Sequence, residues 1–411
     1  MSTLQIIEQA DSKLIYPTNK KLGSFFGLDE STVRNWKKSK PDFYSEQLTT
    51  YRLDRSPFIT EDEYKRAFND SITSDISARI KNREIPGILD SEGNILYPVN
   101  MQTILDNTNE IRKSKETNVL SFSNFKGGVG KTTTAVNIAT VLAFYGLNVL
   151  IIDLDIQANT TSLFDLYHQD FDKTIVDLMY LVEDDNIDEI IRSSVVSLND
   201  RINSIGKLNI IPNSSNLVNA EKFDAFEQSM KTYGNINQIL DEVLSYVKDD
   251  YDFIIIDTPP SIGLPLRLSI LATDYFIVVL QPDKMAKDGM PSFIKPIQKN
   301  AKAYKKHKNK DIVVLGGVMN LYQDNLNIHQ ANLNLIDEEL VSTVENNGLG
   351  ESKLFETKIK RSSMLIEAQN KNGSLLYYEP TSELVRDYFN LTDEIIESII
   401  IDKLSKLEED K

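Results

Sequence analysis

Lys126-Gly-Gly-Val-Gly-Lys-Thr-Thr133 is the stretch that decides the fold of this 411-residue chain. It follows an apolar run at residues 119–123 and leads into a segment with helical periodicity. Strand, glycine turn and helix N-terminus, in that order, are the context of a phosphate-binding loop. The stretch therefore predicts an α/β nucleotide-binding domain.

The residue types in this stretch suit the binding of a nucleotide and a magnesium ion. Its three glycines let backbone N–H groups converge on phosphate oxygens without a Cβ in the way. Lys131 is placed to reach the β- and γ-phosphates, and the Thr132 hydroxyl is placed to bind Mg²⁺. The N-terminus of the following helix adds partial positive charge. We therefore expect ATP or ADP and Mg²⁺ as cofactors.

Composition excludes several other classes of site. The chain has no cysteine, which rules out disulfides, iron–sulfur clusters and thiolate metal sites. Its three histidines lie far apart in sequence, so a histidine-based metal site is not expected. No apolar run approaches membrane-spanning length, and the N-terminus is too polar for a signal peptide. A net charge of −16 argues against a uniformly basic surface for nucleic acid, but it allows local basic patches.

We divide the chain into three parts. Residues 1–41 hold a helix–turn–helix pattern, and residues 42–116 hold linker helices and a hairpin. Residues 117–411 alternate strand-like and helix-like runs, which predicts a mostly parallel sheet flanked by helices. The strand candidates of this third part are residues 119–123, 149–153, 208–211, 253–257, 275–280 and 312–318. Residues 392–411 read as an acidic amphipathic helix.

Two more strand candidates end in carboxylates. The run at 149–153 ends in Asp153 and is followed by Asp155, and the run at 253–257 ends in Asp257. An apolar run that ends in aspartate is also what a strand meeting a solvated turn looks like. Parallel strands, however, place their carboxyl ends at one edge of a sheet, where open α/β sheets bind ligands. We expect these carboxylates to lie beside the phosphate-binding loop.

These three motifs together resemble the ParA/MinD group of deviant-Walker ATPases over most of residues 117–390. Phe125 stands where the general phosphate-binding pattern has its first glycine, and Lys126 follows it, as in that group. One departure is Ile156, which replaces the usual proline of an Asp-Pro-Gln motif. The resemblance implies an ATPase that works as a nucleotide-sandwich homodimer.

The resemblance also implies roles for individual residues. Lys126 would cross the dimer interface to the phosphates of the partner subunit, and Asp155 would position the attacking water. Asp153 would support the nucleotide-responsive switch, and Asp257 would hold Mg²⁺ through water. The residues implied to bind nucleotide are Gly127, Gly128, Val129, Gly130, Lys131, Thr132, Thr133, Asp153 and Asp257.

The assignment of Lys126, and that of one further nucleotide-binding candidate, Asn320, have structural alternatives. Lys126 could be a solvated lysine beside a glycine turn, although the completeness of the motif favours the functional interpretation. Asn320, which follows the strand candidate at 312–318, could contact the nucleotide base or could simply close a packed strand end.

Residues 19–38 predict a helix–turn–helix for DNA. From Thr18 to Lys40 the chain has six basic and two acidic residues, a local positive charge within a negative chain. Asp29 can cap the second helix, which would face the major groove. A small helical hairpin used for packing is the alternative. The hairpin at residues 85–97 could be the wing of a winged helix. The residues expected to contact DNA are Ser31, Thr32, Arg34, Asn35 and Lys38.

A second basic segment, residues 295–310, contains seven lysines and no acidic residue. It is either a solvated helix face or a surface that binds DNA phosphates without sequence preference. The lysines of this segment assigned to DNA are Lys299, Lys302, Lys305 and Lys306. The C-terminal segment carries more acid than base, so it does not predict a membrane-surface helix.

The leading hypothesis is a plasmid-partition ATPase that is cytoplasmic and associated with the nucleoid. It would bind non-specific DNA in the ATP state and repress its own operon through the helix–turn–helix, as the larger ParA proteins do. The resemblance also implies a ParB-like centromere-binding partner that stimulates hydrolysis. A nucleotide-sensing repressor without a role in segregation is the main alternative. A metabolic reductase would need cluster cysteines, and a synthetase would have no use for a DNA-binding head.

Overall fold

The computed structural model divides the chain into two compact units, residues 1–102 and 103–411. It describes residues 88–89, 95–97, 101–166, 169, 171–199, 205–233, 238–261, 263–371, 373–380 and 382–409. In the first unit the described residues form a short antiparallel pair, β1 (Ile88–Leu89) and β2 (Ile95–Tyr97). This pair agrees with the predicted hairpin. The predicted helix–turn–helix lies outside the described residues, and the predicted domain boundaries stay predictions.

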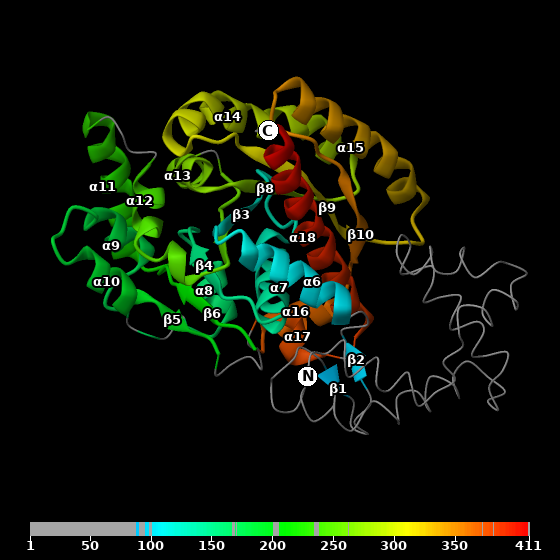
Figure 1. Ribbon diagram of the computed structural model, residues 1–411, viewed down its shortest axis with the longest axis horizontal. Helices are drawn as coiled ribbons and strands as arrows, with labels where there is room; N and C mark the ends of the chain where they lie inside the picture. The colour runs from blue at the N-terminus through cyan, green and yellow to red at the C-terminus, as the bar shows by residue number, and fades with distance from the viewer. Residues whose placement is uncertain are drawn as a thin grey trace, which may run out of the picture. The chain divides into compact units, whose positions relative to one another are not determined.

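Within the described residues, the second unit is built on an eight-stranded sheet (Figure 1). Its strand order is β10-β9-β8-β3-β7-β4-β6-β5, and every pairing is parallel except that of β5 with β6. The strands are β3 (Asn118–Ser123), β4 (Val149–Asp153), β5 (Val196–Ser197), β6 (Leu208–Ile211), β7 (Phe253–Asp257), β8 (Tyr275–Leu280), β9 (Val313–Tyr322) and β10 (Leu354–Lys360). The central strands are buried and apolar, as a parallel sheet covered on both faces requires.

One face of the sheet is covered by the helix that follows the phosphate-binding loop and by the C-terminal helix. The first, α7 (Lys131–Phe144), contacts β3, β4 and β7, and α18 (Glu383–Glu409) lies along it and along β10 (Figure 1). All residues of α7 except Thr132 are buried. The helical periodicity of this segment indicated one buried face. The helix is in fact buried on both sides, because α18 covers the side that faces away from the sheet. The shorter helices α6 (Met101–Lys113), α16 (Ser363–Gln369) and α17 (Leu375–Tyr378) complete this part of the fold.

The opposite face carries two hydrophobic clusters side by side. One packs β4 and β7 against the helices from α9 to α13, and the other packs β8 and β9 against α13, α14 and α15. The helices on this side and at the sheet edge are α8 (Asn159–Leu163), α9 (Ile175–Tyr180), α10 (Ile187–Ser194), α11 (Leu217–Tyr233), α12 (Ile239–Ser245), α13 (Leu264–Ala272), α14 (Lys284–Lys308) and α15 (Asn327–Asn346). A single 3₁₀ turn, η2 (Lys248–Asp250), precedes β7.

Sequence periodicity located the buried strands closely and missed the edge of the sheet. Four of the six predicted strands, β4, β6, β7 and β8, have the predicted bounds. The strand β10 was not predicted because three of its seven residues are charged and one is threonine, so it has no continuous apolar run. The C-terminal helix begins at Glu383, before the predicted start at 392, because its first turns carry the apolar residues that cover α7.

A half-buried carboxylate on α18 is hydrogen-bonded to the residue that caps the C-terminus of α7, and it gives a pH-dependent prediction. The Tyr145 hydroxyl donates to Asp393 Oδ1 at 2.9 Å. Burial raises the pKa of Asp393 to about 6, although the hydrogen bond from Tyr145 opposes the rise. The stability from this group is therefore present below the ordinary carboxyl pKa and is lost as the pH rises through about 6. We expect Asp393→Asn to raise the free energy of unfolding at pH 8 by up to about 3 kcal/mol, and to raise the Tm accordingly.

Thermal unfolding followed by circular dichroism at pH 8 and pH 5 checks this expectation. The gain from Asp393→Asn should shrink at pH 5, because the wild-type carboxyl is then largely protonated. Tyr145→Phe is the control, since it removes the hydrogen bond and leaves the charge, so it should destabilise the protein most at pH 8. A lower Tm for Asp393→Asn at pH 8 would contradict the assignment.

Candidate nucleotide site

The phosphate-binding loop joins the end of β3 to the start of α7. Gly128 and Gly130 have φ angles of 72° and 89°, in the left-handed region that favours glycine. A Cβ on Gly130 would lie 2.2 Å from Asn320 Nδ2, so a side chain there would collide with the floor of the loop. The loop therefore has the conformation and the room that its glycines predict.

Asn320 supports this loop from below. Its Nδ2 donates to the carbonyl of Val129 at 2.8 Å and to Thr134 Oγ1 at 3.2 Å, and its side chain is buried beneath the loop. Its Oδ1 accepts from the backbone N–H of Leu321. The amide is engaged by the protein in this structure, and its predicted contact with the nucleotide base stays a prediction. In this structure Asn320 stabilises the phosphate-binding loop through these hydrogen bonds.

The two lysines of the loop have different surroundings. Lys131 is only 6% exposed, lines the pocket above the loop, and donates to the carbonyl of Lys126 at 3.2 Å. Burial lowers its pKa, although Asp257 and Asp155 oppose the shift. Lys126 does not line that pocket; its Nζ binds Gln281 Oε1 at 2.8 Å and Asp283 Oδ2 at 2.5 Å.

The contacts of Lys126 extend to α14. Asp283 is the N-cap of that helix, and its Oδ1 accepts from the backbone N–H of Ala286 while its Oδ2 holds Lys126. Gln281 also donates to the carbonyl of Gly128. Phe125, the residue that replaces the first glycine of the general pattern, packs edge-on against Phe293 of α14 with ring centroids 5.3 Å apart. The start of the loop is thus anchored to α14.

Asp257 and Thr132 form the candidate magnesium site. Asp257 Oδ2 accepts from Thr132 Oγ1 at 2.7 Å and from Thr160 Oγ1 at 2.8 Å. Its other oxygen is buried and accepts no hydrogen bond from any residue that the structure describes. Burial raises the pKa of Asp257 to about 6, against the two threonine hydrogen bonds.

This arrangement fits a hydrated magnesium ion. The buried Asp257 oxygen without a described partner would accept from a metal-bound water, and Thr132, which lines the pocket above the loop, would supply a hydroxyl ligand. Among the described residues no group of three or more acidic or histidine side chains could cage a metal by itself. Mg²⁺ characteristically keeps several waters and binds through one or two protein groups plus phosphates.

Asp153 and Asp155 lie at the end of β4 with distinct roles in the local structure. Asp153 is fully buried and accepts from the N–H of Asp155 and from both the N–H and the hydroxyl of Thr161. Burial and then the nearby Asp257 raise its pKa to about 8. Asp155 lines the pocket above the loop, where its carboxylate accepts from Gln157 N and Asn159 Nδ2.

Ile156 occupies the first central position of a tight turn. The N–H of Ala158 donates to the carbonyl of Asp155 at 2.8 Å, which closes the turn across Ile156 and Gln157. Proline is favoured at that position because its φ angle is preset, but most residues can occupy it. The Ile156 side chain instead packs against the adjacent hydrophobic cluster. The turn therefore forms without the proline.

The pocket above the loop also contains residues that sequence reasoning missed. Gln369 and Asn370, from the end of α16, line it, and Gln369 Nε2 donates to Thr133 Oγ1 at 2.6 Å. Asn159 lines it from α8. Gln369 directly follows residues 358–368, which only loosely resemble a late Ile-x-Arg…Glu-Ala segment of the ParA/MinD group, so its contact with the loop could not be read from the sequence. Asn159 follows Asp155 by four residues after β4, and this closeness in sequence was the available signal.

The predicted basic segment lies on α14 and just beyond it, and its lysines differ in whether they form ion pairs. Lys305, Lys308 and Lys310 are paired with Asp311, Asp241 and Asp274. The remaining four lysines are exposed, and no ion pair joins them to a residue that the structure describes. Their helical spacing of four, three and four residues puts them on one face of α14. This lysine stripe consists of Lys295, Lys299, Lys302 and Lys306.

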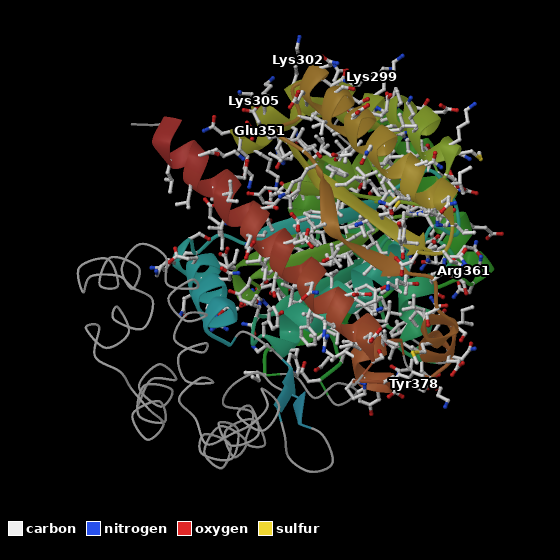
Figure 2. All side chains as sticks on the ribbon, turned by 90° about the vertical axis from the view of Figure 1, so that its right-hand side faces the viewer. Lys299, Lys302, Lys305, Glu351, Arg361 and Tyr378 are labelled. Carbon is white, nitrogen blue, oxygen red and sulfur yellow. The ribbon has the colours of Figure 1, made fainter. Side chains whose placement is uncertain are left out.

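Figure 2 shows Lys299, Lys302 and Lys305 projecting outward from α14. Of the four predicted lysines, Lys299, Lys302 and Lys306 belong to the stripe, and Lys305 lies beside it in an ion pair. The predicted DNA residues of the N-terminal part, Ser31 to Lys38, lie outside the described residues. Their contact with DNA stays a prediction.

The fold and this site define a class: P-loop nucleotide hydrolases with a second lysine at the start of the loop. Residues 117–314 match the family model described as an AAA domain. The chain is 30% identical over 286 residues to the virulence plasmid ParA family protein pGP5-D of Chlamydia psittaci, covering 69% of this chain and 96% of that protein. It is 28% identical over 279 residues to the sporulation initiation inhibitor protein Soj of Bacillus subtilis, covering 67% and 97%. The chain belongs to the ParA family of P-loop ATPases.

Solved structures show the same fold. A variant of Cyanothece McdA in complex with ATP matches with a TM-score of 0.53 at 17% identity, over 69% of this chain and 96% of that one. Cobyrinic acid a,c-diamide synthase from Mycobacterium smegmatis, with a bound ATP analogue and magnesium, matches with a TM-score of 0.51 at 22% identity, over 67% and 93%. Among the described residues of this chain, no helix combines the length and apolarity needed to cross a bilayer.

Proposed function

We propose that this protein is a DNA-partition ATPase that binds Mg²⁺ and ATP and hydrolyses ATP as a nucleotide-sandwich dimer. The observation that carries the proposal is the separation of the two loop lysines. Lys131 lines the pocket above the loop, whereas Lys126 lies outside it, at the base of α14. A lysine in that position can act on a nucleotide bound by a second subunit. Family membership supports the same conclusion.

The loop, Lys131, Thr132, Asp155 and Asp257 would then each have a chemical task. Backbone N–H groups of the loop and Lys131 bind the phosphates, and Thr132 with Asp257 holds the magnesium ion. Magnesium neutralises charge on the phosphates when it is bound. Asp155 orients the attacking water, and its carboxylate is itself fixed by Gln157 N and Asn159 Nδ2. Phosphoryl transfer depends mainly on positioning and charge neutralisation, so these residues suffice without a covalent intermediate.

Dimerisation would require Lys126 to leave its intramolecular partners. In the single chain its ammonium is neutralised by Asp283 and hydrogen-bonded by Gln281. The γ-phosphate of an ATP molecule bound by the partner subunit carries more negative charge than one carboxylate. ATP would therefore favour the exchange, and ADP, which lacks that phosphate, would favour the closed single chain.

The DNA-directed part of the proposal rests on the lysine stripe and on the N-terminal sequence. Four exposed lysines on one helix face, none of them in an ion pair with a residue that the structure describes, suit contacts with DNA phosphates, which carry no sequence information. The N-terminal helix–turn–helix would supply operator recognition and autoregulation. A ParB-like partner would stimulate hydrolysis, and association with the nucleoid would follow from non-specific DNA binding.

The test measures hydrolysis and DNA binding by the full-length protein. We expect slow Mg²⁺-dependent release of phosphate, retention of an arbitrary DNA fragment with ATP, and binding to DNA upstream of the gene with ADP or no nucleotide. Gel shift at fixed salt and phosphate release report all three. Absence of both hydrolysis and nucleotide-dependent DNA binding would refute the proposal.

A repressor without a role in segregation remains the second candidate, because the predicted helix–turn–helix serves it equally well. Loss of the gene separates the two. A partition ATPase is required for stable inheritance of the replicon that carries it, whereas a repressor changes transcription and leaves inheritance intact.

A further inference from the structure

A buried asparagine just after β6 contacts both ends of the segment from Asp155 to Thr161, which carries the candidate catalytic carboxylate. Asn213 lies two residues after β6 and is 1% exposed. Its Nδ2 donates to the backbone carbonyl of Asp155 at 3.0 Å, and its N–H donates to Thr161 Oγ1 at 3.0 Å. The side chain does not line the pocket above the phosphate-binding loop. Its contacts with the site are therefore indirect.

The contact with Thr161 determines how that hydroxyl is used. A hydroxyl has one proton to donate, and it can accept hydrogen bonds as well. Because Thr161 Oγ1 accepts from Asn213, its own proton is directed to Asp153 Oδ2, at 2.7 Å. Asp153 also accepts the N–H of Asp155. The asparagine thereby orients the group that holds the buried carboxylate beneath Asp155.

The contact with Asp155 fixes the turn that carries the carboxylate. The carbonyl of Asp155 accepts from Ala158 N within the turn and from Asn213 Nδ2 across it. Ala158 has a φ of 51°, in a region that L-residues rarely adopt, so the turn depends on surrounding contacts. A catalytic group must be held within about 0.5 Å of its productive position.

A second asparagine holds the first. Asn219, at the start of α11, donates from Nδ2 to Asn213 Oδ1 at 2.6 Å, and its own Oδ1 accepts from Thr174 Oγ1 at 3.0 Å. Thr174 caps α9. These side chains are all buried, so an unmet hydrogen bond among them would carry its full desolvation cost. The amide of Asn213 is therefore locked in one orientation.

We propose that Asn213 is a positioning residue for ATP hydrolysis, which its side chain supports by fixing the Asp155 turn, while its backbone N–H directs the Thr161 hydroxyl to Asp153 in any variant at this position. The inference rests on the proposed ATPase function and adds a residue to it. Asn213 touches neither the loop nor the lysines, so nucleotide binding should not depend on it. The signature is a loss of kcat without a loss of nucleotide affinity.

Asn213→Asp is the sharpest test, because it keeps the size and the acceptor for Asn219 and turns the donor to Asp155 into a repelling oxygen. We expect kcat to fall at least tenfold, with the Kd for ATP in the presence of Mg²⁺ changed less than about threefold, since the direct phosphate contacts remain. Asn209→Asp is the matched control. Asn209 lies on β6, four residues before Asn213, and donates to Tyr251 at 2.8 Å, outside the network, so the kcat of this variant should match the wild type.

The outcomes separate this inference from the proposed function. An inactive wild type overturns the proposed function, whereas an active wild type with unchanged kcat in Asn213→Asp overturns only the inference. A loss of kcat that merely follows a loss of folded protein or of ATP affinity also overturns it. If Asn213→Asp does not fold, the decisive pair is Asn213→Ser and Asn219→Ala. Wild-type kcat in these variants, once circular dichroism shows them folded, counts against the assignment.

Discussion

Replacing Lys126 by glutamine should lower ATP hydrolysis on the order of 10³-fold, the lower range measured for a charge delivered to a transferring phosphate by a second protein. Nucleotide binding should change little, because Lys131 and the loop backbone line the pocket and Lys126 does not. The glutamine amide could still reach Gln281 and Asp283 but would bring no charge to a partner's phosphates. Phosphate release, a fluorescent ATP analogue and light scattering measure hydrolysis, binding and dimerisation separately.

Asp283→Asn is the opposing variant for the same experiment. It removes the charge that holds Lys126, while its side-chain oxygen can still accept from Ala286 N and cap α14. We expect ATP-dependent dimers at lower protein concentration than in the wild type. Unchanged dimerisation and hydrolysis in Lys126→Gln would show that Lys126 is only a surface lysine beside a glycine turn. An Asp283→Asn variant that dimerises less than the wild type would remove the intramolecular ion pair from the mechanism.

The sheet was predictable because burial on both faces leaves an unbroken apolar record in the sequence. β7 and β8 read as Phe-Ile-Ile-Ile-Asp and Tyr-Phe-Ile-Val-Val-Leu, and both have the predicted bounds. The edge strand β10 gave no such record. Its outward residues are charged, and part of its pairing is met by a side chain: the Glu394 carboxylate accepts the N–H groups of Glu356 and Thr357. That contact links residues about 40 positions apart, so no local pattern could reveal it.

The candidate site was predictable where a motif is continuous in sequence, and not where the fold assembles it. The loop, the end of β4 and the end of β7 were each marked by their own residues. Asn320 was noticed for its position after a strand, but its hydrogen bonds to Val129 and Thr134 could not be read from the sequence. Gln369 directly follows a segment with only a loose family match, and Asn213 comes from a segment with no motif. Their roles depend on hydrogen bonds to residues 236 and 58 positions away.

The lysine stripe gives the other large expected effect. Replacing Lys299 and Lys302 by glutamine should reduce the slope of log affinity against log salt by about two for non-specific DNA, as expected when two phosphate contacts are lost. Both lysines are exposed and make no ion pair with any residue that the structure describes, so the change should leave the fold intact. DNA binding by fluorescence anisotropy at several salt concentrations, with ATP present, provides the slope.

A matched loss of charge elsewhere distinguishes a binding surface from a general effect of net charge. Lys207 and Lys248 are also exposed, lie just before β6 and in the 3₁₀ turn η2 before β7, and make no ion pair with a described residue. Lys207→Gln with Lys248→Gln removes the same charge from a chain whose net charge is already −16. If this control reduces the slope as much as the α14 pair, DNA contacts are spread over the molecule and the stripe is a solvated helix face. If only the α14 pair reduces the slope, this strongly acidic protein binds DNA through one helix. That helix begins at Lys284, next to Asp283, the ion-pair partner of Lys126.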